Sequence, residues 1–178
     1  MIEIIFEAHG TTYDNEAKLP SGHNDVELSP LGIQQSKEMG ERYKNDYFDA
    51  IFCSDLQRAY KSAEIGFKNK WPIIRDARLR ECNYGEYTQN PSVWREDEKI
   101  HRIKESFPKG ESYIQTTARM RGFLEDLIKN YEGKKVMIIG HRATQYGLEN
   151  LVNKVPLEQI ISAPWKWQPG WKYNFEKL

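Results

Sequence analysis

The 178-residue sequence has little cysteine, no excess of either charge and no long apolar run. Its two cysteines, Cys53 and Cys82, have neither CxxC spacing nor the density of a disulfide scaffold, so we expect reduced thiols. Lys plus Arg total 26 and Asp plus Glu total 26, which argues against a general nucleic-acid binder. No stretch approaches the ~18 apolar residues of a membrane helix, and residues 1–8 are too short for a signal peptide. We therefore expect a cytoplasmic protein that binds neither nucleic acid nor membrane.

The chain also lacks internal repeats and any linker rich in glycine, serine or proline. With 39% hydrophobic residues it can bury one core, so residues 1–178 are expected to form a single domain. Short apolar runs alternate with longer helical patterns, which indicates an α/β fold. The runs at 2–8, 50–53 and 136–140 are apolar enough to be buried on both faces, as is typical of parallel strands.

One helix is expected to start at Ser29, which is followed by proline at the first helical position. Within it Gly32, Ser36 and Gly40 recur every four residues. Such a stripe of small residues lets a helix lie close to a sheet, which would explain the two helix-weakening glycines.

Four further segments complete the expected fold. The pair Ser54-Asp55 reads as the cap of a second helix, and an apolar stripe from 113 to 131 predicts a third. Residues 88–109 are dense in alternating charge and are expected to form a helical, lid-like insertion. Residues 170–178 alternate polar and apolar side chains, which predicts a closing strand at a sheet edge.

Polar residues follow each of the three predicted strands directly. His9 follows the first, Arg58 lies just beyond the second, and His141 follows the third. The carboxyl ends of parallel strands meet at one edge of a sheet, where ligands bind. Taken singly, each residue has an ordinary interpretation as a satisfied histidine or a solvated arginine. Two histidines and an arginine at three strand ends together predict a shared site.

Six segments in one order then resemble the motifs of a known family. Residues 6–16 (FEAHGTTYDNE) are similar to RHG(E/Q)(T/S)xxN, residues 53–59 (CSDLQRA) to SSDLxRA, and residues 79–87 (LRECNYGEY) to LREx(D/N)(F/Y)GxW. The family is the histidine phosphatase superfamily, in its phosphoglycerate mutase-like branch. The resemblance implies a three-layer α/β/α sandwich with a mostly parallel central sheet. The other similar segments are 21–32, 110–113 and 139–143.

The resemblance further implies a phosphomonoester phosphatase without metal or cofactor, acting on a small phosphorylated metabolite. His9 would take the phosphoryl group as a phosphohistidine, which water then hydrolyses. Glu81 would protonate the leaving alkoxide and later accept a proton from water. Arg58 and His141 would hold the phosphoryl oxygens, whose negative charge needs donors around it. The expected substrate-binding residues are Gly10, Asn15, Ser21, Gly22 and Arg142.

The chain departs from the family pattern at two positions. Ala8 stands where the motif has arginine, and Arg142 stands where the family has glycine after the second histidine. One interpretation is that Arg142 replaces the missing phosphate-binding cation. The other is that Arg142 points away and pairs with Glu7 or a helix carboxylate. Glu81 likewise has an ordinary interpretation, as a salt-bridge partner of a neighbouring arginine at position 78 or 80.

Two other functions stay open at this point. A mutase would retain and return the phosphoryl group, but the mutase-like continuation YGxLxGLNK is absent after Tyr84-Gly85. A catalytically silent protein that binds phosphate ligands is suggested by Ala8. Assembly as a homodimer also stays open, as does the identity of the substrate.

Overall fold

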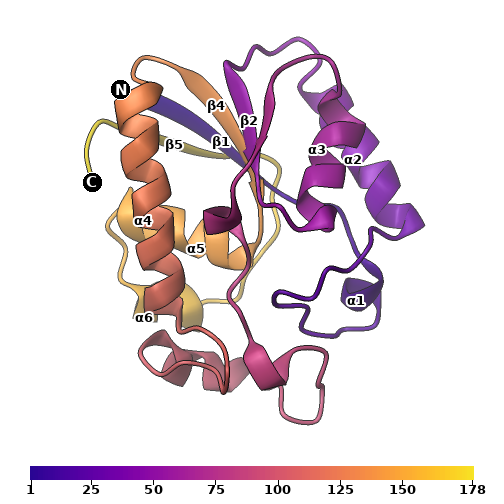
Figure 1. Ribbon diagram of the computed structural model, residues 1–178, viewed down its shortest axis with the longest axis vertical. Coiled ribbons are helices and arrows are strands. Elements are labelled where there is room, and N and C mark those ends of the chain that lie inside the picture. The colour runs from indigo at the N-terminus through magenta and orange to yellow at the C-terminus, as the bar shows by residue number, and fades with distance from the viewer.

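The computed structural model describes residues 1–178 and contains a five-stranded sheet in the order β3-β2-β4-β1-β5 (Figure 1). β1, β2, β3 and β4 are parallel, and β5 runs antiparallel to β1 at the edge. The α/β fold with a mostly parallel sheet is therefore confirmed. β3 was not predicted, because its three residues lie at the other edge and are largely exposed. The strands are β1 (Ile2–Ala8), β2 (Ala50–Cys53), β3 (Ile73–Arg75), β4 (Lys135–Gly140) and β5 (Trp171–Phe175).

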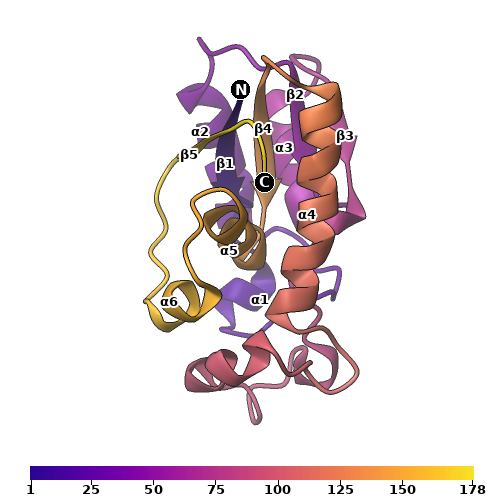
Figure 2. The same ribbon diagram turned by 90° about the vertical axis from the view of Figure 1, so that its left-hand side faces the viewer.

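Helices cover both faces of the sheet and form the outer two layers (Figures 1 and 2). α2 (Pro30–Arg42) and α3 (Gln57–Phe67) pack together on one face. α4 (Tyr113–Asn130) and α5 (Arg142–Leu151) pack together on the other. No helix combines the length and the apolar character that crossing a membrane requires. The shorter elements are α1 (Tyr13–Glu16), α6 (Leu157–Ser162) and the 3-10 helices η1 (Ala77–Leu79), η2 (Gly85–Tyr87) and η3 (Glu96–Ile103).

The strand period of two divides the core between the two faces. Ile4 and Phe6 of β1 belong to the apolar cluster under α4 and α5, whereas Ile5 belongs to the cluster under α2 and α3. By the same alternation Ala8 is directed toward the α5 side and Glu7 toward the α2 side. Glu7 there accepts a hydrogen bond of 2.6 Å from the Tyr43 hydroxyl.

Two expectations for the helices were wrong in detail. The stripe of small residues on α2 faces α3 and a loop instead of the sheet: a Cβ on Gly40 would meet the carbonyl oxygen of Gly66 at 2.4 Å. Ser54-Asp55 does not cap α3, which begins after Leu56 without a side-chain cap. The side chains of Ser54 and Asp55 instead bond His141 and Arg80.

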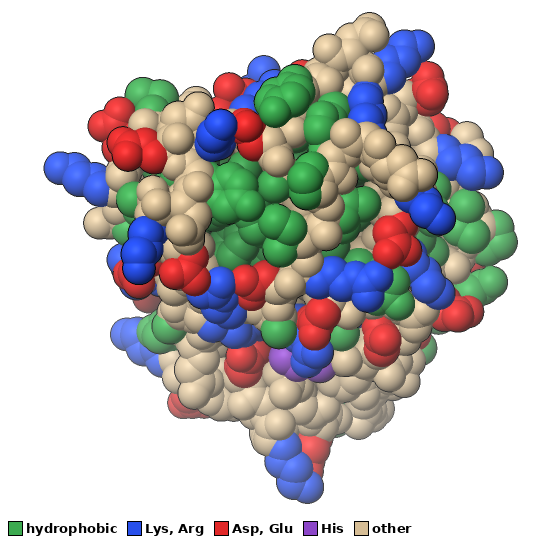
Figure 3. All heavy atoms as spheres, turned by 45° about the horizontal axis from the view of Figure 1, so that its top comes forward, with side chains coloured by type: hydrophobic (Ala, Val, Ile, Leu, Met, Phe, Trp, Pro, Cys, Tyr) green, Lys and Arg blue, Asp and Glu red, His purple; other side chains and the backbone are tan.

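Residues 88–109, here called the covering segment, lie below the carboxyl ends of the strands in both ribbon views (Figures 1 and 2). Their only regular element is η3, so the expected helical excursion is a 3-10 helix. Phe107 and Ile103 anchor the segment in an apolar cluster shared with α5 and α6. Acidic and basic side chains are interspersed around an apolar area on the face shown in Figure 3, in keeping with the neutral formal charge.

Candidate active site

Strand register brings the two predicted histidines together. Ala8 pairs with Gly140 in the parallel β1–β4 ladder, so His9 and His141 follow at the same sheet edge. The backbone N–H of His9 donates to the Gly140 carbonyl at 3.1 Å. Their ring centroids lie 5.0 Å apart. The crevice beyond the parallel strands is therefore the place where the predicted site forms.

His9 has one ring nitrogen engaged and one free. Its Nδ1 lies 2.7 Å from the Gly10 carbonyl, which can only accept, so Nδ1 carries the hydrogen. In the neutral ring this leaves the lone pair on Nε2. Burial first, and the Arg58 guanidinium second, lower the pKa of His9 to about 3. The imidazole is thus neutral at neutral pH, with an unprotonated Nε2.

His141 is buried and only partly satisfied. Its Nε2 lies 2.6 Å from the Ser54 hydroxyl, while Nδ1 is buried without a hydrogen-bond partner. Burial first, and the Arg58 guanidinium second, lower the pKa of His141 well below its usual value. A buried nitrogen without a partner costs free energy unless a ligand completes its hydrogen bond.

Arg58 is one of the most deeply buried side chains, with 1% of its surface exposed. It lies in the first turn of α3, and its Nη1 and Nη2 donate to the carbonyls of Asn24 and Gly22 at 2.8 and 2.7 Å. No carboxylate forms a salt bridge with it. A buried cation anchored only by carbonyl oxygens keeps its charge available for an anion.

Glu81 lies in the segment between η1 and η2 and is 8% exposed. Its Oε1 accepts from the Cys82 N–H at 2.7 Å. The interpretation of Glu81 as a salt-bridge partner of Arg78 or Arg80 is wrong. Arg78 pairs with two aspartates, and Arg80 with Asp55.

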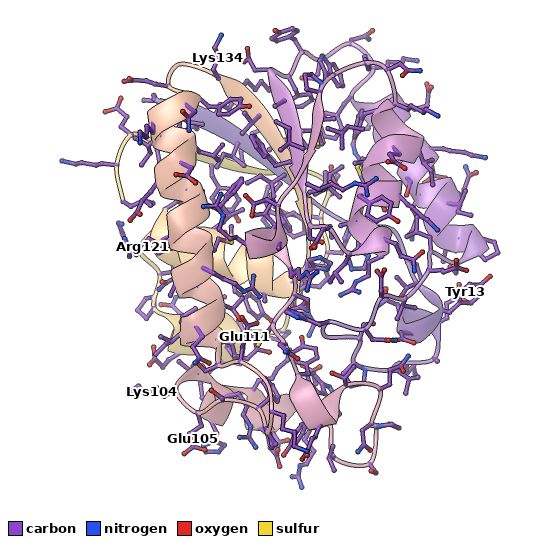
Figure 4. The ribbon with its side chains drawn as sticks, in the orientation of Figure 1. Tyr13, Lys104, Glu105, Glu111, Arg121 and Lys134 are labelled. Carbon is purple, nitrogen blue, oxygen red and sulfur yellow. The ribbon has the colours of Figure 1, made fainter.

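Arg119 of α4 holds the backbone around Glu81 and was missed in the sequence. Its guanidinium donates to the Glu81 carbonyl at 2.8 Å and to the Glu111 carboxylate at 2.9 Å. Glu111 lies where the covering segment meets α4 (Figure 4) and accepts from the Asn83 N–H. His23 Nε2 lies 2.8 Å from the same Glu81 carbonyl. Only the stretch Gly110-Glu111-Ser112 signalled this arrangement, and nothing pointed to Arg119.

His9, Arg58, Glu81 and His141 open into one pocket of about 790 Å³. Asn15 belongs to the capping box of α1, where its Oδ1 accepts from the Thr12 N–H, so the two amide hydrogens stay free. Gly22 has a φ of +49° and supplies a carbonyl to Arg58. No group of three or more His, Cys, Asp or Glu is arranged to hold a metal ion. The predicted residues that line the pocket are His9, Gly10, Asn15, Ser21, Gly22, Arg58, Glu81, His141 and Arg142.

Arg142 lines the pocket and also forms an ion pair. Its Nη1 lies 3.4 and 3.5 Å from the two carboxylate oxygens of Glu96 in η3. Its guanidinium stands 5.3 Å from the Trp165 ring, which stacks on Trp171. Trp171 in turn contacts Phe6, on the face of β1 toward which Ala8 is directed. Arg142 does not pair with Glu7. It pairs with a carboxylate of a 3-10 helix, as the second interpretation allowed, but it lines the pocket instead of pointing away from it.

A family model described as "Histidine phosphatase superfamily (branch 1)" matches residues 4–166. The chain belongs to this superfamily. A 2,3-bisphosphoglycerate-dependent phosphoglycerate mutase of Allorhizobium ampelinum is 32% identical over 89% of this chain and 83% of that protein. A Bacillus subtilis protein named "Uncharacterized phosphatase PhoE" is 30% identical over 83% of this chain and 76% of that protein. The family resemblance is thus confirmed, and the relatives include proteins named as phosphatases and proteins named as mutases.

Solved structures share the fold of this chain. The structure of YhfR from Bacillus stearothermophilus superposes with a TM-score of 0.81, covering 94% of this chain and 87% of that chain at 22% identity. The phosphoglycerate mutase-like architecture expected from the motifs is therefore present.

Proposed function

We propose that this protein is a phosphomonoester phosphatase in which His9 carries the phosphoryl group as a phosphohistidine. The observation that carries the proposal is the state of His9. Its Nδ1–H is held by the Gly10 carbonyl, while Nε2 is unprotonated in the site pocket. That is what attack on a phosphorus atom requires. The ester bond to the leaving oxygen breaks as the N–P bond forms, and water then hydrolyses the N–P bond.

The donors around His9 suit a transferring phosphoryl group. Arg58 supplies a buried positive charge, and the free Nδ1 of His141 supplies a hydrogen bond once Ser54 donates to Nε2. The side-chain amide of Asn15 adds a neutral donor. In such a transition state the protein acts mainly by positioning and by stabilising the charge on the equatorial oxygens. Gly10, Ser21 and Gly22 shape the wall around this group.

We assign the role of the missing motif arginine to Arg142. Only Nη1 of its guanidinium contacts the protein carboxylate, which leaves donors free on a side chain that lines the pocket. The contacts that lead from Arg142 through Trp165 and Trp171 to Phe6 support this assignment, because Ala8 is directed toward the same face of β1 as Phe6. A phosphate dianion in a partly dry pocket requires such compensating charge.

Glu81 is the proposed general acid. Its carboxyl group lines the pocket, has no basic partner and keeps Oε2 free. It would protonate the leaving alkoxide in the first step and take a proton from the attacking water in the second. Arg119 and His23, which bond its backbone carbonyl, would hold this segment in place.

Two alternatives use the same site. A mutase would return the phosphoryl group to a second hydroxyl instead of to water, and several relatives are named phosphoglycerate mutases. The sequence after Tyr84-Gly85 lacks the mutase-like continuation, which favours hydrolysis. A catalytically silent protein would bind a phosphate group through Arg58 and Arg142 without forming a phosphohistidine.

One experiment separates these functions. Incubation of the protein with p-nitrophenyl phosphate should release inorganic phosphate and leave an acid-labile phosphoprotein in rapidly quenched samples. His9→Ala should abolish both, with His101→Ala on the exposed face of η3 as the matched control. Full turnover in His9→Ala would contradict the nucleophile assignment. Wild-type protein that binds phosphate without turnover would identify a silent relative.

A further inference from the structure

Glu96 lies between two cations at the wall where the covering segment meets the pocket. One of its carboxylate oxygens is 2.8 Å from Lys99 Nζ, and both are within 3.5 Å of Arg142 Nη1. The Trp94 indole N–H also donates to it at 3.3 Å. Glu96 and Arg142 line the pocket, whereas Lys99 lies behind them. Two positive charges thus share one carboxylate.

The two contacts of Glu96 differ in strength. The Lys99 contact has the length of a strong charge-assisted hydrogen bond, whereas the Arg142 contacts are more than half an ångström longer. The Lys99 side chain is only 4% exposed, and its Nζ lies 5.9 Å from the centroids of both the Trp94 and the Tyr146 rings, so packing confines it. The Arg142 side chain is 36% exposed. Glu96 is therefore fixed by Lys99, and Arg142 is held loosely by Glu96.

We propose that Glu96 is a positioning residue that sets the phosphate affinity of the site by competing for Arg142, and that Lys99 limits this competition. The inference rests on the proposed function, because it requires Arg142 to bind phosphate. Without phosphate, Arg142 rests on Glu96. When a phosphate dianion enters, Arg142 turns to it, and Glu96 keeps Lys99 as its counter-ion.

The charges around the cluster support this direction of exchange. Burial first, and Arg142 second, lower the pKa of Lys99, while Glu96 and Glu81 oppose that change. The ion-paired cluster of Lys99, Arg142 and Glu96 holds two positive charges and one negative charge. A second negative charge at Arg142 relieves this excess, so phosphate binding and the Lys99–Glu96 pair are compatible. Without Lys99, Glu96 would have Arg142 as its only positively charged partner and would hold it more firmly.

The test measures the dissociation constant of inorganic phosphate by calorimetry in a set of variants. Glu96→Gln should tighten phosphate binding by about twofold to fivefold, within the range expected for loss of a partly exposed competing ion pair. Lys99→Met, which keeps the aliphatic stem between the aromatic rings, should weaken binding by a similar factor. The double variant should bind like Glu96→Gln, because Lys99 acts only through Glu96. Opposite signs from two residues of one ion pair are not expected of a purely structural role.

The role of Arg142 is tested by repeating the Glu96 substitution in a variant that lacks the Arg142 side chain. In Arg142→Gly, the further change Glu96→Gln should no longer tighten phosphate binding. Glu98→Gln on the same 3-10 helix is the matched control, since Glu98 contacts only Arg95 at 4.0 Å, and it should leave the affinity unchanged. In Glu96→Gln the KM for p-nitrophenyl phosphate should fall while the rate of phosphoenzyme formation at saturation stays within about twofold.

Unchanged or weaker binding in Glu96→Gln, or tighter binding that persists without Arg142, would overturn the inference. Glu96→Gln is nearly isosteric and changes an exposed side chain, so the variant is expected to fold. It therefore shows whether phosphate affinity rises or falls even if Lys99→Met does not fold. The proposed function is judged separately by the phosphohistidine on His9. Normal phosphoenzyme with no Glu96 effect rejects this inference alone. A missing phosphoenzyme rejects the proposed function, while the calorimetric cycle still measures the coupling.

Discussion

Two sides of the pocket hold their charged groups in different ways. The floor is formed by His9, Arg58 and His141, and the covering side by Arg142 together with Glu96 of the covering segment. On the floor, Arg58 is 1% exposed and bonded to backbone carbonyls, and His141 is held by the Ser54 hydroxyl. On the covering side, Arg142 is 36% exposed and shares Glu96 with Lys99. The floor is therefore organised before substrate arrives, whereas the covering side exchanges one anion for another.

This difference separates two tasks that a phosphate site must perform. Groups aimed at the transition state contribute most when they need no reorganisation during the reaction. Groups that select and admit the substrate can move, at some cost in affinity. Substitutions on the floor should thus act mainly on turnover, and those on the covering side mainly on binding.

The largest effect is expected at Arg58. Arg58→Met should lower kcat/KM by about a hundredfold to a thousandfold, the range found when one donor is removed from a preorganised site. Arg75→Met, in an exposed ion pair with Glu64, is the control for the loss of one arginine. Steady-state kinetics on folded variants decides the comparison. A change of less than about threefold would place Arg58 outside the phosphate shell.

A smaller, substrate-dependent effect is expected at Glu81. Glu81→Gln should slow phosphoenzyme formation from alkyl phosphates far more than from p-nitrophenyl phosphate, because only an alkoxide needs a proton as it leaves. The first step must be measured alone by rapid quench, since water activation can limit the second. Equal slowing of both substrate types would remove Glu81 from the role of general acid.

The smallest effect concerns stability against pH. His9 and His141 have pKa values lowered by burial, His9 to about 3, so the unfolded chain binds more protons below its ordinary value of 6.5. The stability that these neutral histidines contribute is complete above pH 6.5 and is lost as pH falls toward the folded pKa. Each contributes a slope of at most about 1.4 kcal/mol per pH unit.

Denaturant unfolding between pH 7 and pH 4.5 measures this slope. His9→Gln should make the free energy of unfolding fall less steeply than in the wild type, with His101→Gln on the covering segment as the control. The comparison between floor and covering side fails if both substitutions flatten the curve equally.

The residues of the floor and the presence of Arg142 at the pocket could be predicted from the sequence, but the carboxylate that pairs with Arg142 could not be identified, for a physical reason. Apolar strands followed directly by His9 and His141 have one arrangement in a parallel sheet, because the register brings their ends together. The contacts of Arg142 depend on how residues 88–109 fold, and alternating charges there allow many pairings of similar energy. Arg119 was missed because an arginine on a helix is ordinary until its carbonyl partners are known.

The helix positions show the same limit. The start of α2 at Pro30 was predictable from a local cap, whereas Ser54 and Asp55 carry the same local signal and are engaged by distant residues instead. A cap signal and a site residue use the same side chains, and only the tertiary structure decides between them.

The most direct test asks whether Arg142 supplies the positive charge that the family motif places, as an arginine, at the position of Ala8. Inorganic phosphate binding should be measured by calorimetry in the wild type, in Arg142→Gly and in Ala8→Arg with Arg142→Gly. The account predicts that Arg142→Gly weakens binding by about tenfold or more and that the added Ala8→Arg recovers part of the loss. Unchanged phosphate affinity in a folded Arg142→Gly variant would contradict it.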